Sequence, residues 1–132
     1  MYRILDETRK RLGERMLRFA QDLVRTPSES LREADLAERI EKEMKYLGYD
    51  EVFRDGAGNV IGLMRGRRGD GTVLLNSHMD TVCAEPSSSW EKDPLCGEIE
   101  GQILHGLGAA DCKCGLAAQI YTGAILKDSL LP

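Results

Sequence analysis

His78 and Asp80 are the first pair of side chains in this sequence whose types and spacing indicate chemistry. They follow an apolar run at residues 72–76 that is typical of a strand. Residues two apart on a strand point to the same side, so the imidazole and the carboxylate can share one face. A carboxylate beside a metal-bound imidazole fixes the tautomer of the ring and raises its basicity. The pair therefore predicts a metal ligand with its supporting carboxylate, although a surface histidine beside a solvated aspartate is the commoner arrangement for such a tripeptide alone.

Asp111 is the second candidate, because a run of small residues at positions 106–110 leads up to its carboxylate. Asp111 also precedes a predicted helix, so a helix N-cap is its alternative role. A phosphate-binding loop is excluded by spacing, because Lys113 lacks the preceding glycine and the following Ser or Thr that such a loop requires. Lys113 is therefore predicted to be a solvated residue at the start of the helix.

The four cysteines, Cys83, Cys96, Cys112 and Cys114, contain no pair at the two-residue spacing of a zinc knuckle or a thioredoxin-like site. In the absence of an export signal, reduced thiols in the cytoplasm are expected. Their ordinary role is that of small, half-buried side chains. A thiolate metal site is the alternative, as is a redox pair formed by Cys112 and Cys114.

Trp90 and His105 also have two interpretations each. Trp90 is the single tryptophan and lies in a polar loop, where its ring is expected to pack the loop down. Stacking on a substrate is the alternative. His105 precedes the glycine-rich run and is expected at the edge of a hairpin, with a role as an extra metal ligand as the alternative.

Three helices are predicted from apolar residues that recur at helical spacing. The first covers residues 5–24 and stops before Pro27, because the residue before a proline is pushed out of the helical region. The second starts at Ser30, which has the spacing of a capping box with Glu33. The third covers residues 114–130.

The segments between the helices have a strand-like pattern. Strands are predicted at residues 52–53, 60–64 and 72–76, with a hairpin at 99–104 and an exposed turn at 66–71. The third strand is apolar on both faces, as in the centre of a covered sheet. Helices before and after a mixed sheet predict an α/β fold, a layered sheet with flanking helices. Ligands gather at the carboxyl ends of strands in such sheets, so His78, Asp80 and Asp111 are expected to lie together there.

Composition narrows the classes of partner. The 132 residues carry a net charge of −4, which supplies no basic field for nucleic acid or an anionic membrane. No apolar run reaches membrane-spanning length, and the charged first twenty residues hold no signal peptide. We expect one globular unit in the cytoplasm that binds neither nucleic acid nor membrane.

The motifs taken together are more specific than any one of them. The chain has Ser-His-Met-Asp-Thr-Val at 77–82, a Trp at 90 with Asp-Pro at 93–94, and Gly-x-Gly-Ala-x-Asp-x-Lys-x-Gly at 106–115. This pattern resembles the zinc-dependent metallopeptidase and amidohydrolase family, which contains aminoacylase, acetylornithine deacetylase, succinyl-diaminopimelate desuccinylase and glutamate carboxypeptidase. Thr-Pro-Ser-Glu-Ser at 26–30 and Gly-Asn-Val at 58–60 extend the resemblance along the chain. The Ser-Glu-Ser element and residues 125–128 most resemble the hydrolase branch linked to selenium metabolism.

The resemblance implies a catalytic site with two zinc ions, and Co or Mn would also suit its imidazole and carboxylate ligands. In such a site His78 ligates one metal, Asp80 is the catalytic residue that supports His78, and Asp111 bridges both metals, with a cis peptide bond to Cys112. The two cations share a water, lower its pKa and polarise the carbonyl of the amide that is cleaved. The implied substrate is a peptide or a small molecule such as an N-acyl amino acid, and the full-length form is a homodimer.

The chain also departs from the family pattern. Leu107 stands where the family has Arg, and Cys114 where it has Gly. The family's later Glu-Glu pair supplies a general base and a metal ligand, but Asp128 is the one acidic residue here after Asp111. We therefore expect residues 1–132 to be the N-terminal portion of a metallopeptidase-like catalytic domain, without the remainder of that domain or the dimerisation domain. Such a portion should be inactive alone, because the general base is missing.

Two other functions stay open at this point. A truncated relic or a regulatory protein would bind metal weakly and catalyse nothing. An unrelated cysteine-and-histidine metal or redox module would bind metal through its thiols. Blocking the thiols would then abolish metal binding, whereas His78→Ala would not.

Overall fold

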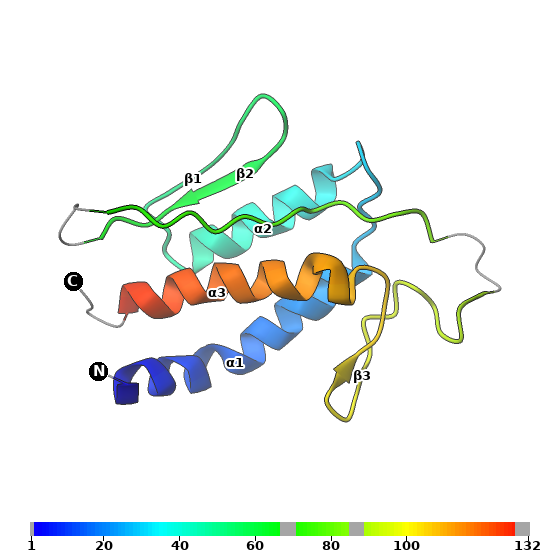
Figure 1. Ribbon diagram of the computed structural model, residues 1–132, viewed down its shortest axis with the longest axis horizontal. Helices are drawn as coiled ribbons and strands as arrows, with labels where there is room; N and C mark the ends of the chain where they lie inside the picture. The colour runs from blue at the N-terminus through cyan, green and yellow to red at the C-terminus, as the bar shows by residue number, and fades with distance from the viewer. Residues whose placement is uncertain (1, 67–70, 85–88, 129–132) are drawn as a thin grey trace.

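Three helices dominate the fold (Figure 1). The computed structural model describes residues 2–66, 71–84 and 89–128. Helix α1 spans Tyr2–Arg25, α2 spans Ala34–Tyr46 and α3 spans Cys114–Asp128. The three predicted helices are confirmed, and the first ends before Pro27 as expected. The last two residues of the third predicted helix, and residues 67–70 of the predicted exposed turn, lie outside the described residues.

The start of α2 differs from the predicted capping box. Glu33 occupies the N-cap position, but no side chain caps the helix there. Its carboxylate instead accepts a hydrogen bond from the backbone N–H of Leu31, at 2.8 Å. The Ser30 hydroxyl donates to the Asp80 carboxylate at 2.5 Å. A charged acceptor makes a stronger hydrogen bond than a neutral one, which explains why Ser30 bonds to a distant carboxylate and not to its own helix.

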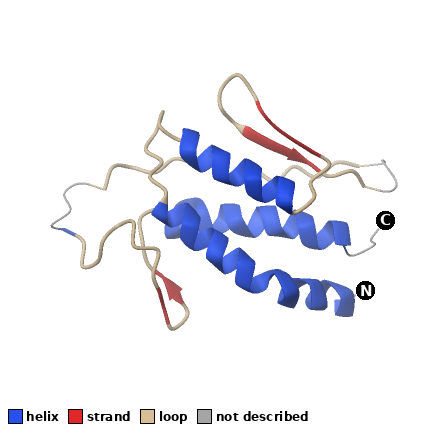
Figure 2. Cartoon of the chain, turned by 180° about the vertical axis from the view of Figure 1, so that it is seen from behind, coloured by secondary structure: helices blue, strands red, loops and turns tan. Residues whose placement is uncertain are grey.

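The core lies where the three helices meet, and Figure 2 shows them as one layer seen from behind. Helices α1 and α2 each contribute the apolar stripe that their sequences predict, whereas α3 is apolar around most of its surface. Full burial of one large apolar side chain stabilises the fold by about 1.5–3 kcal/mol, so this cluster holds the helices together. Its buried members are Phe19, Ala20, Leu23, Leu36, Ile40, Leu116, Ala117, Ile120 and Tyr121.

A polar network also joins the three helices. The Arg15 guanidinium on α1 donates two hydrogen bonds to the Glu43 carboxylate on α2, at 2.8 and 2.9 Å. The buried Tyr121 hydroxyl on α3 donates to the same carboxylate. Arg15 also lies over the ring of Tyr46, at 3.4 Å from its centroid. Glu43 is 8% exposed, and these partners satisfy a charge that would otherwise be costly to bury.

The strands pair as two separate antiparallel hairpins. Strand β1 (Glu51–Arg54) pairs with β2 (Val60–Leu63), and β3 (Ile99–Glu100) pairs with β4 (Ile103–Leu104). The first hairpin packs against α2. The mixture of helices and strands confirms the α/β class, but the described strands do not form the single mixed sheet that was expected.

Residues 72–76, predicted as a central covered strand, form no strand in the structure. The extended chain that contains this segment passes in front of α2 and beside α3 in Figure 1, and the Gln119 side chain donates to the carbonyl of Asn76 at 3.0 Å. Val73 and Leu74 are each 86% exposed. A strand exists through its ladder partners. In the described part of the chain, residues 72–76 belong to no ladder. The nearest bridge is the single parallel one between Glu29 and Thr81, five residues farther along.

No helix in the described ranges is both long and apolar enough to cross a membrane.

Candidate metal centre

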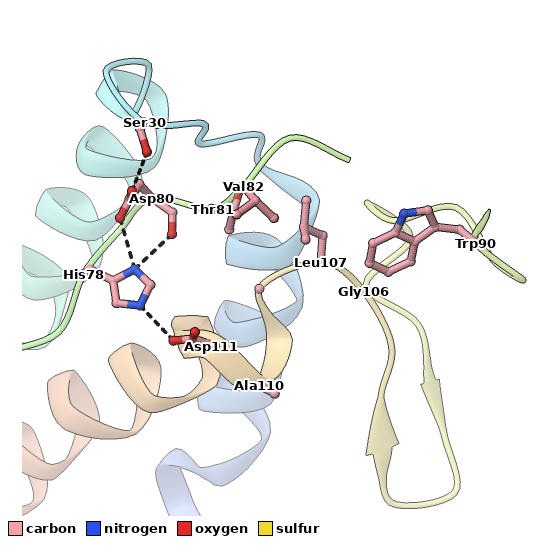
Figure 3. A pocket seen from close by; sticks show the side chains of 11 residues that line it. Ser30, His78, Asp80, Thr81, Val82, Trp90, Gly106, Leu107, Ala110 and Asp111 are labelled. Atoms are coloured by element: carbon pink, nitrogen blue, oxygen red, sulfur yellow. Dashed lines mark hydrogen bonds and ion pairs between the residues drawn. The ribbon is translucent and has the colours of Figure 1, made fainter. Parts of the chain in front are cut away.

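The structure brings His78, Asp80 and Asp111 together at one end of the helical layer (Figure 3). The Nδ1 atom of His78 lies 3.1 Å from a carboxylate oxygen of Asp80 and 3.0 Å from the carbonyl oxygen of the same residue. The Nε2 atom lies 2.9 Å from a carboxylate oxygen of Asp111. Both ring nitrogens therefore face acidic groups. The three residues lie together as expected, but not at the carboxyl ends of sheet strands, because residues 72–76, which precede His78, form no strand in the structure.

The two carboxylates favour a charged imidazole. The hydrogen bond with Asp111 is the largest cause that raises the pKa of His78, to about 9, and the contacts with Asp80 act in the same direction. At neutral pH the ring therefore carries a proton on each nitrogen in this chain. A bound divalent cation would take the place of the Nε2 proton, since a metal-binding imidazole is neutral.

Asp80 is held by a residue from the loop before α2. The hydrogen bond from Ser30 is the main cause that lowers the pKa of Asp80, and the contact with His78 lowers it further. The carboxylate is therefore ionised and fixed in direction at neutral pH. Ser30, Asp80 and His78 form one chain of hydrogen bonds, and Figure 3 shows it leading toward Asp111.

Asp111 lies in a kinked turn, η2 (Ala109–Lys113), ahead of α3. The turn starts at Gly108, whose φ of 76° favours glycine, and an added Cβ there would lie 2.6 Å from the Thr81 side chain. Asp111 and Cys112 both have non-helical backbone angles. The Asp111–Cys112 peptide bond is cis, as the resemblance implies. Because α3 begins only at Cys114, Asp111 is not its N-cap, and its carboxylate is 90% exposed.

The sequence predicts that Lys113 is solvated at the start of the helix, and this prediction is wrong, because the side chain is buried. Only 1% of the residue is exposed, and its Nζ donates to the carbonyl of Thr26 at 2.8 Å. Burial lowers the pKa of Lys113 to about 8. The methylene stem of Lys113 packs against Gly108. The side chain therefore ties the glycine-rich turn to the end of α1.

A pocket of about 380 Å³ opens beside these residues. Trp90 lines the wall opposite His78, as Figure 3 shows, and Leu107 and Val82 add apolar surface. Trp90 is 38% exposed, so its ring is available to a ligand and does not only pack its loop. His105 lies outside the residues that line the pocket. Its Nε2 pairs with Glu100 of β3 at 3.5 Å, as expected for a hairpin residue.

The donor set fits a divalent cation. The ligand atoms of His78, Asp111 and Cys112 all lie within 4.8 Å of one another. Imidazole, carboxylate and thiolate are the ligands that zinc uses in proteins, and the Asp80 contact to Nδ1 is the usual support of a ligating histidine. Sequence reasoning did not place Cys112 or Ser30 at this centre. The position of Cys112 next to Asp111 was the available signal for the first, and nothing local to Ser30 indicated the second.

The cysteines are all unpaired thiols in the structure. Cys114 lies at the first turn of α3, where burial raises the pKa of its thiol.

Comparison with known proteins found related sequences over most of this chain. The sequence model described as "Peptidase family M20/M25/M40" matches residues 74–132, which include His78, Asp80 and Asp111. The protein named uncharacterized protein YgeY, from Escherichia coli, is 35% identical over 127 residues, which are 96% of this chain and 31% of the relative. The succinyl-diaminopimelate desuccinylase of Cereibacter sphaeroides is 35% identical over 99 residues, covering 74% of this chain and 26% of the relative. That of Hahella chejuensis is 33% identical over 104 residues, covering 77% and 27%.

The chain thus spans less than a third of the length of these curated relatives. The branch linked to selenium metabolism is not tested by them and stays a prediction.

Proposed function

Because the chain belongs to peptidase family M20/M25/M40, we propose that it is the N-terminal portion of a metal-dependent hydrolase that cleaves amide bonds. The substrate class is an N-acyl amino acid or a peptide, which the name succinyl-diaminopimelate desuccinylase of two relatives supports. The single observation that carries the proposal is the hydrogen-bonded chain of Asp80, His78 and Asp111 at the edge of a pocket.

Each residue has a role in this proposal. His78 holds one metal through Nε2, because Nδ1 is engaged by Asp80. Asp80 positions the ring and keeps its tautomer. Asp111 presents an exposed carboxylate that is able to bridge two ions. When bound, two zinc ions would supply an activated water and polarise the amide carbonyl. Trp90 and Leu107 would place the apolar part of the substrate against the pocket wall.

The chain alone is proposed to be inactive. The described residues that line the pocket include two carboxylates, Asp80 and Asp111, and both are engaged with His78. No third carboxylate among them is available as the general base, whose contribution is roughly 10²–10⁴-fold. The remainder of a longer protein would supply it, and would also form the homodimer that the resemblance implies. The proposed compartment is the cytoplasm, which the four unpaired thiols support.

A non-catalytic metal-binding or regulatory protein is the second candidate. The observation that favours it is that the described residues lining the pocket leave no third carboxylate to act as a general base. Both candidates contain the metal centre. They differ in whether a longer protein that contains this chain hydrolyses amides.

The first test is calorimetric titration of the chain with zinc, with a hydrolysis assay on N-acyl amino acids and dipeptides. We expect weak zinc binding that His78→Ala removes, and no turnover. Tight binding at two sites with turnover that His78→Ala abolishes would show that the chain is already a complete enzyme. Zinc binding that is unchanged in His78→Ala would overturn the metal centre itself.

The second test completes the protein. The matching stretch of the Hahella chejuensis desuccinylase is replaced by this chain, and amide hydrolysis of the chimera is measured against its own His78→Ala variant. Turnover that depends on His78 supports the enzyme. A chimera that folds and binds zinc without turnover supports the regulatory candidate.

A further inference from the structure

Cys112 is the third residue whose ligand atom lies at the metal centre. Its Sγ belongs to the cluster, with His78 and Asp111, whose ligand atoms lie within 4.8 Å of one another. The thiol is half-buried and donates weakly to the Ser77 hydroxyl at 3.5 Å and to the carbonyl of His78 at 3.4 Å. These contacts hold the sulfur beside the imidazole. The centre therefore offers nitrogen, oxygen and sulfur, and not nitrogen and oxygen alone.

We propose that Cys112 is a metal ligand, so that the centre binds a thiophilic divalent cation such as Zn²⁺ through His78, Asp111 and Cys112. The inference rests on the proposed function, because it concerns the same centre. As the sulfur–metal bond forms, the S–H bond breaks and its proton passes to solvent. No electrons are transferred, so no oxidant or reductant is needed.

The backbone explains how two adjacent residues face one ion. Asp111 has φ −130° and ψ 93°, and Cys112 has φ −138° and ψ 32°, so neither follows the helical path of the residues around them. In a regular helix, neighbouring side chains diverge and do not face a common point. The kink in η2 instead lets the carboxylate and the thiol approach the same imidazole.

The distances suit one ion after a small movement. Zinc bonds are about 2.3 Å to sulfur and about 2.0–2.2 Å to nitrogen or oxygen, so two ligands of one zinc lie at most about 4.5 Å apart. In the structure the ligand atoms of the three residues lie within 4.8 Å of one another, which is only slightly more than this maximum. The His78 side chain is 49% exposed and that of Asp111 is 90% exposed, so both have room to adjust.

A sulfur ligand changes which ion is preferred. Thiolates select soft and borderline cations, whereas carboxylate and water suit Mg²⁺ and Mn²⁺. With Cys112 as a ligand, the centre should prefer Zn²⁺ and Co²⁺ strongly over Mn²⁺. Replacing the sulfur by oxygen in Cys112→Ser should reduce that preference. Cys114→Ser is the matched control, because Cys114 is two residues away and lies outside the described cluster.

The experiment is a Co²⁺ titration of the 132-residue chain, followed by optical absorption. A thiolate bound to Co²⁺ gives intense charge-transfer absorption in the near ultraviolet, whereas nitrogen and oxygen ligands give only weak visible bands. We expect this charge-transfer absorption in the parent chain and in Cys114→Ser, and its loss in Cys112→Ser. Competition with Zn²⁺ should show affinity at least about tenfold weaker in Cys112→Ser, since even outer partners of a ligand are worth 10–100-fold. Cys112→Ala, with circular dichroism, separates loss of a ligand from loss of folding.

Each other outcome overturns the inference. Visible bands that depend on His78 without charge-transfer absorption would remove Cys112 from the centre and leave the proposed function standing. Charge-transfer absorption that is lost in Cys114→Ser and kept in Cys112→Ser would assign the sulfur elsewhere. If the chain takes up no Co²⁺, or takes it up equally in His78→Ala, both the inference and the metal centre of the proposed function are overturned.

Discussion

At the scale of single residues, the proposed metal centre includes two side chains that would support a ligand without binding the metal. Asp80 fixes the His78 ring, and Ser30 fixes Asp80. A supporting carboxylate of this kind is worth about 10–100-fold in metal affinity. We therefore expect Asp80→Asn to weaken zinc binding by that factor. Ser30→Ala should weaken it less, because the carboxylate would keep its place on the ring.

Competition titration with a chromogenic chelator measures both effects. Asp6→Asn is the control for the lost charge, because Asp6 pairs with Arg9 and Lys10 on α1. Equal zinc affinity in Asp80→Asn and Asp6→Asn would contradict the positioning role of Asp80.

Lys113 is predicted to stabilise the fold. Its side chain is buried, so Lys113→Ala removes both its packing and its hydrogen bond to the carbonyl of Thr26. We expect the free energy of unfolding to fall by about 2–4 kcal/mol, the usual range for a large-to-small change in a core. Lys113→Met should lower the free energy of unfolding less, because methionine keeps most of the side-chain volume and buries no charge.

Urea denaturation of the parent chain, Lys113→Ala and Lys113→Met measures these differences in the free energy of unfolding. Lys127→Ala is the control, because the Lys127 ammonium pairs with Asp50 nearer the surface. A loss in Lys113→Ala no larger than in Lys127→Ala would mean that Lys113 is not a structural part of the turn.

At the scale of the elements, local signals found the helices and the hairpin at residues 99–104. The spacing of Leu23 and Ile40 with their neighbours located α1 and α2, and Pro27 marked the end of α1. The capping box failed because Ser30 has a stronger, distant acceptor in Asp80, which no local pattern reveals. Lys113 was misjudged for a similar reason, since its burial depends on the end of α1, 87 residues earlier in the chain.

Tyr49 connects β2 with α3 and makes the stability of the fold depend on pH. Its ring contacts Gly62 of β2 and Gly123 of α3, and its hydroxyl donates to the carbonyl of Ile120 at 2.8 Å. Burial raises the pKa of Tyr49 to about 12, from the ordinary value of 10.0. A raised pKa in the folded state means that the stabilisation is complete below about pH 10. It is lost as the pH rises toward 12, because the unfolded chain ionises first.

We therefore expect the free energy of unfolding to fall between pH 10 and 12, and Tyr49→Phe to fall less over that interval. At pH 7 the same variant should be less stable by about 1 kcal/mol, because it lacks one hydrogen bond. In Tyr49→Phe part of the fall in the free energy of unfolding should persist, since burial also raises the pKa of Tyr121. Tyr2→Phe, at a position that is 81% exposed, is the control. Identical pH profiles for Tyr49→Phe and the parent chain would contradict the prediction.

At the scale of the whole molecule, the candidate centre was more predictable than the sheet. His78, Asp80 and Asp111 were candidates from their types and spacing, the family resemblance implied one shared site, and they do lie together. The central strand could not be established in the same way, because an apolar run predicts a strand while its pairing depends on partners elsewhere. Residues 72–76 show this directly: their pattern is that of a strand, yet the described structure leaves Val73 and Leu74 exposed.

This exposed segment predicts that the chain associates with itself. Extended backbone with apolar side chains and few ladder contacts is a template on which another chain pairs. We expect the apparent mass in sedimentation experiments to rise with protein concentration. Leu74→Lys should weaken the association by roughly tenfold or more, because losing one buried leucine contact costs about 1.5–3 kcal/mol and about 1.4 kcal/mol is a factor of ten. Leu31→Lys is the matched control, because Leu31 is 96% exposed but lies in the loop before α2. A chain that stays monomeric at all concentrations would contradict the predicted association. An equal effect of Leu31→Lys would show that general surface hydrophobicity, and not this segment, causes the association.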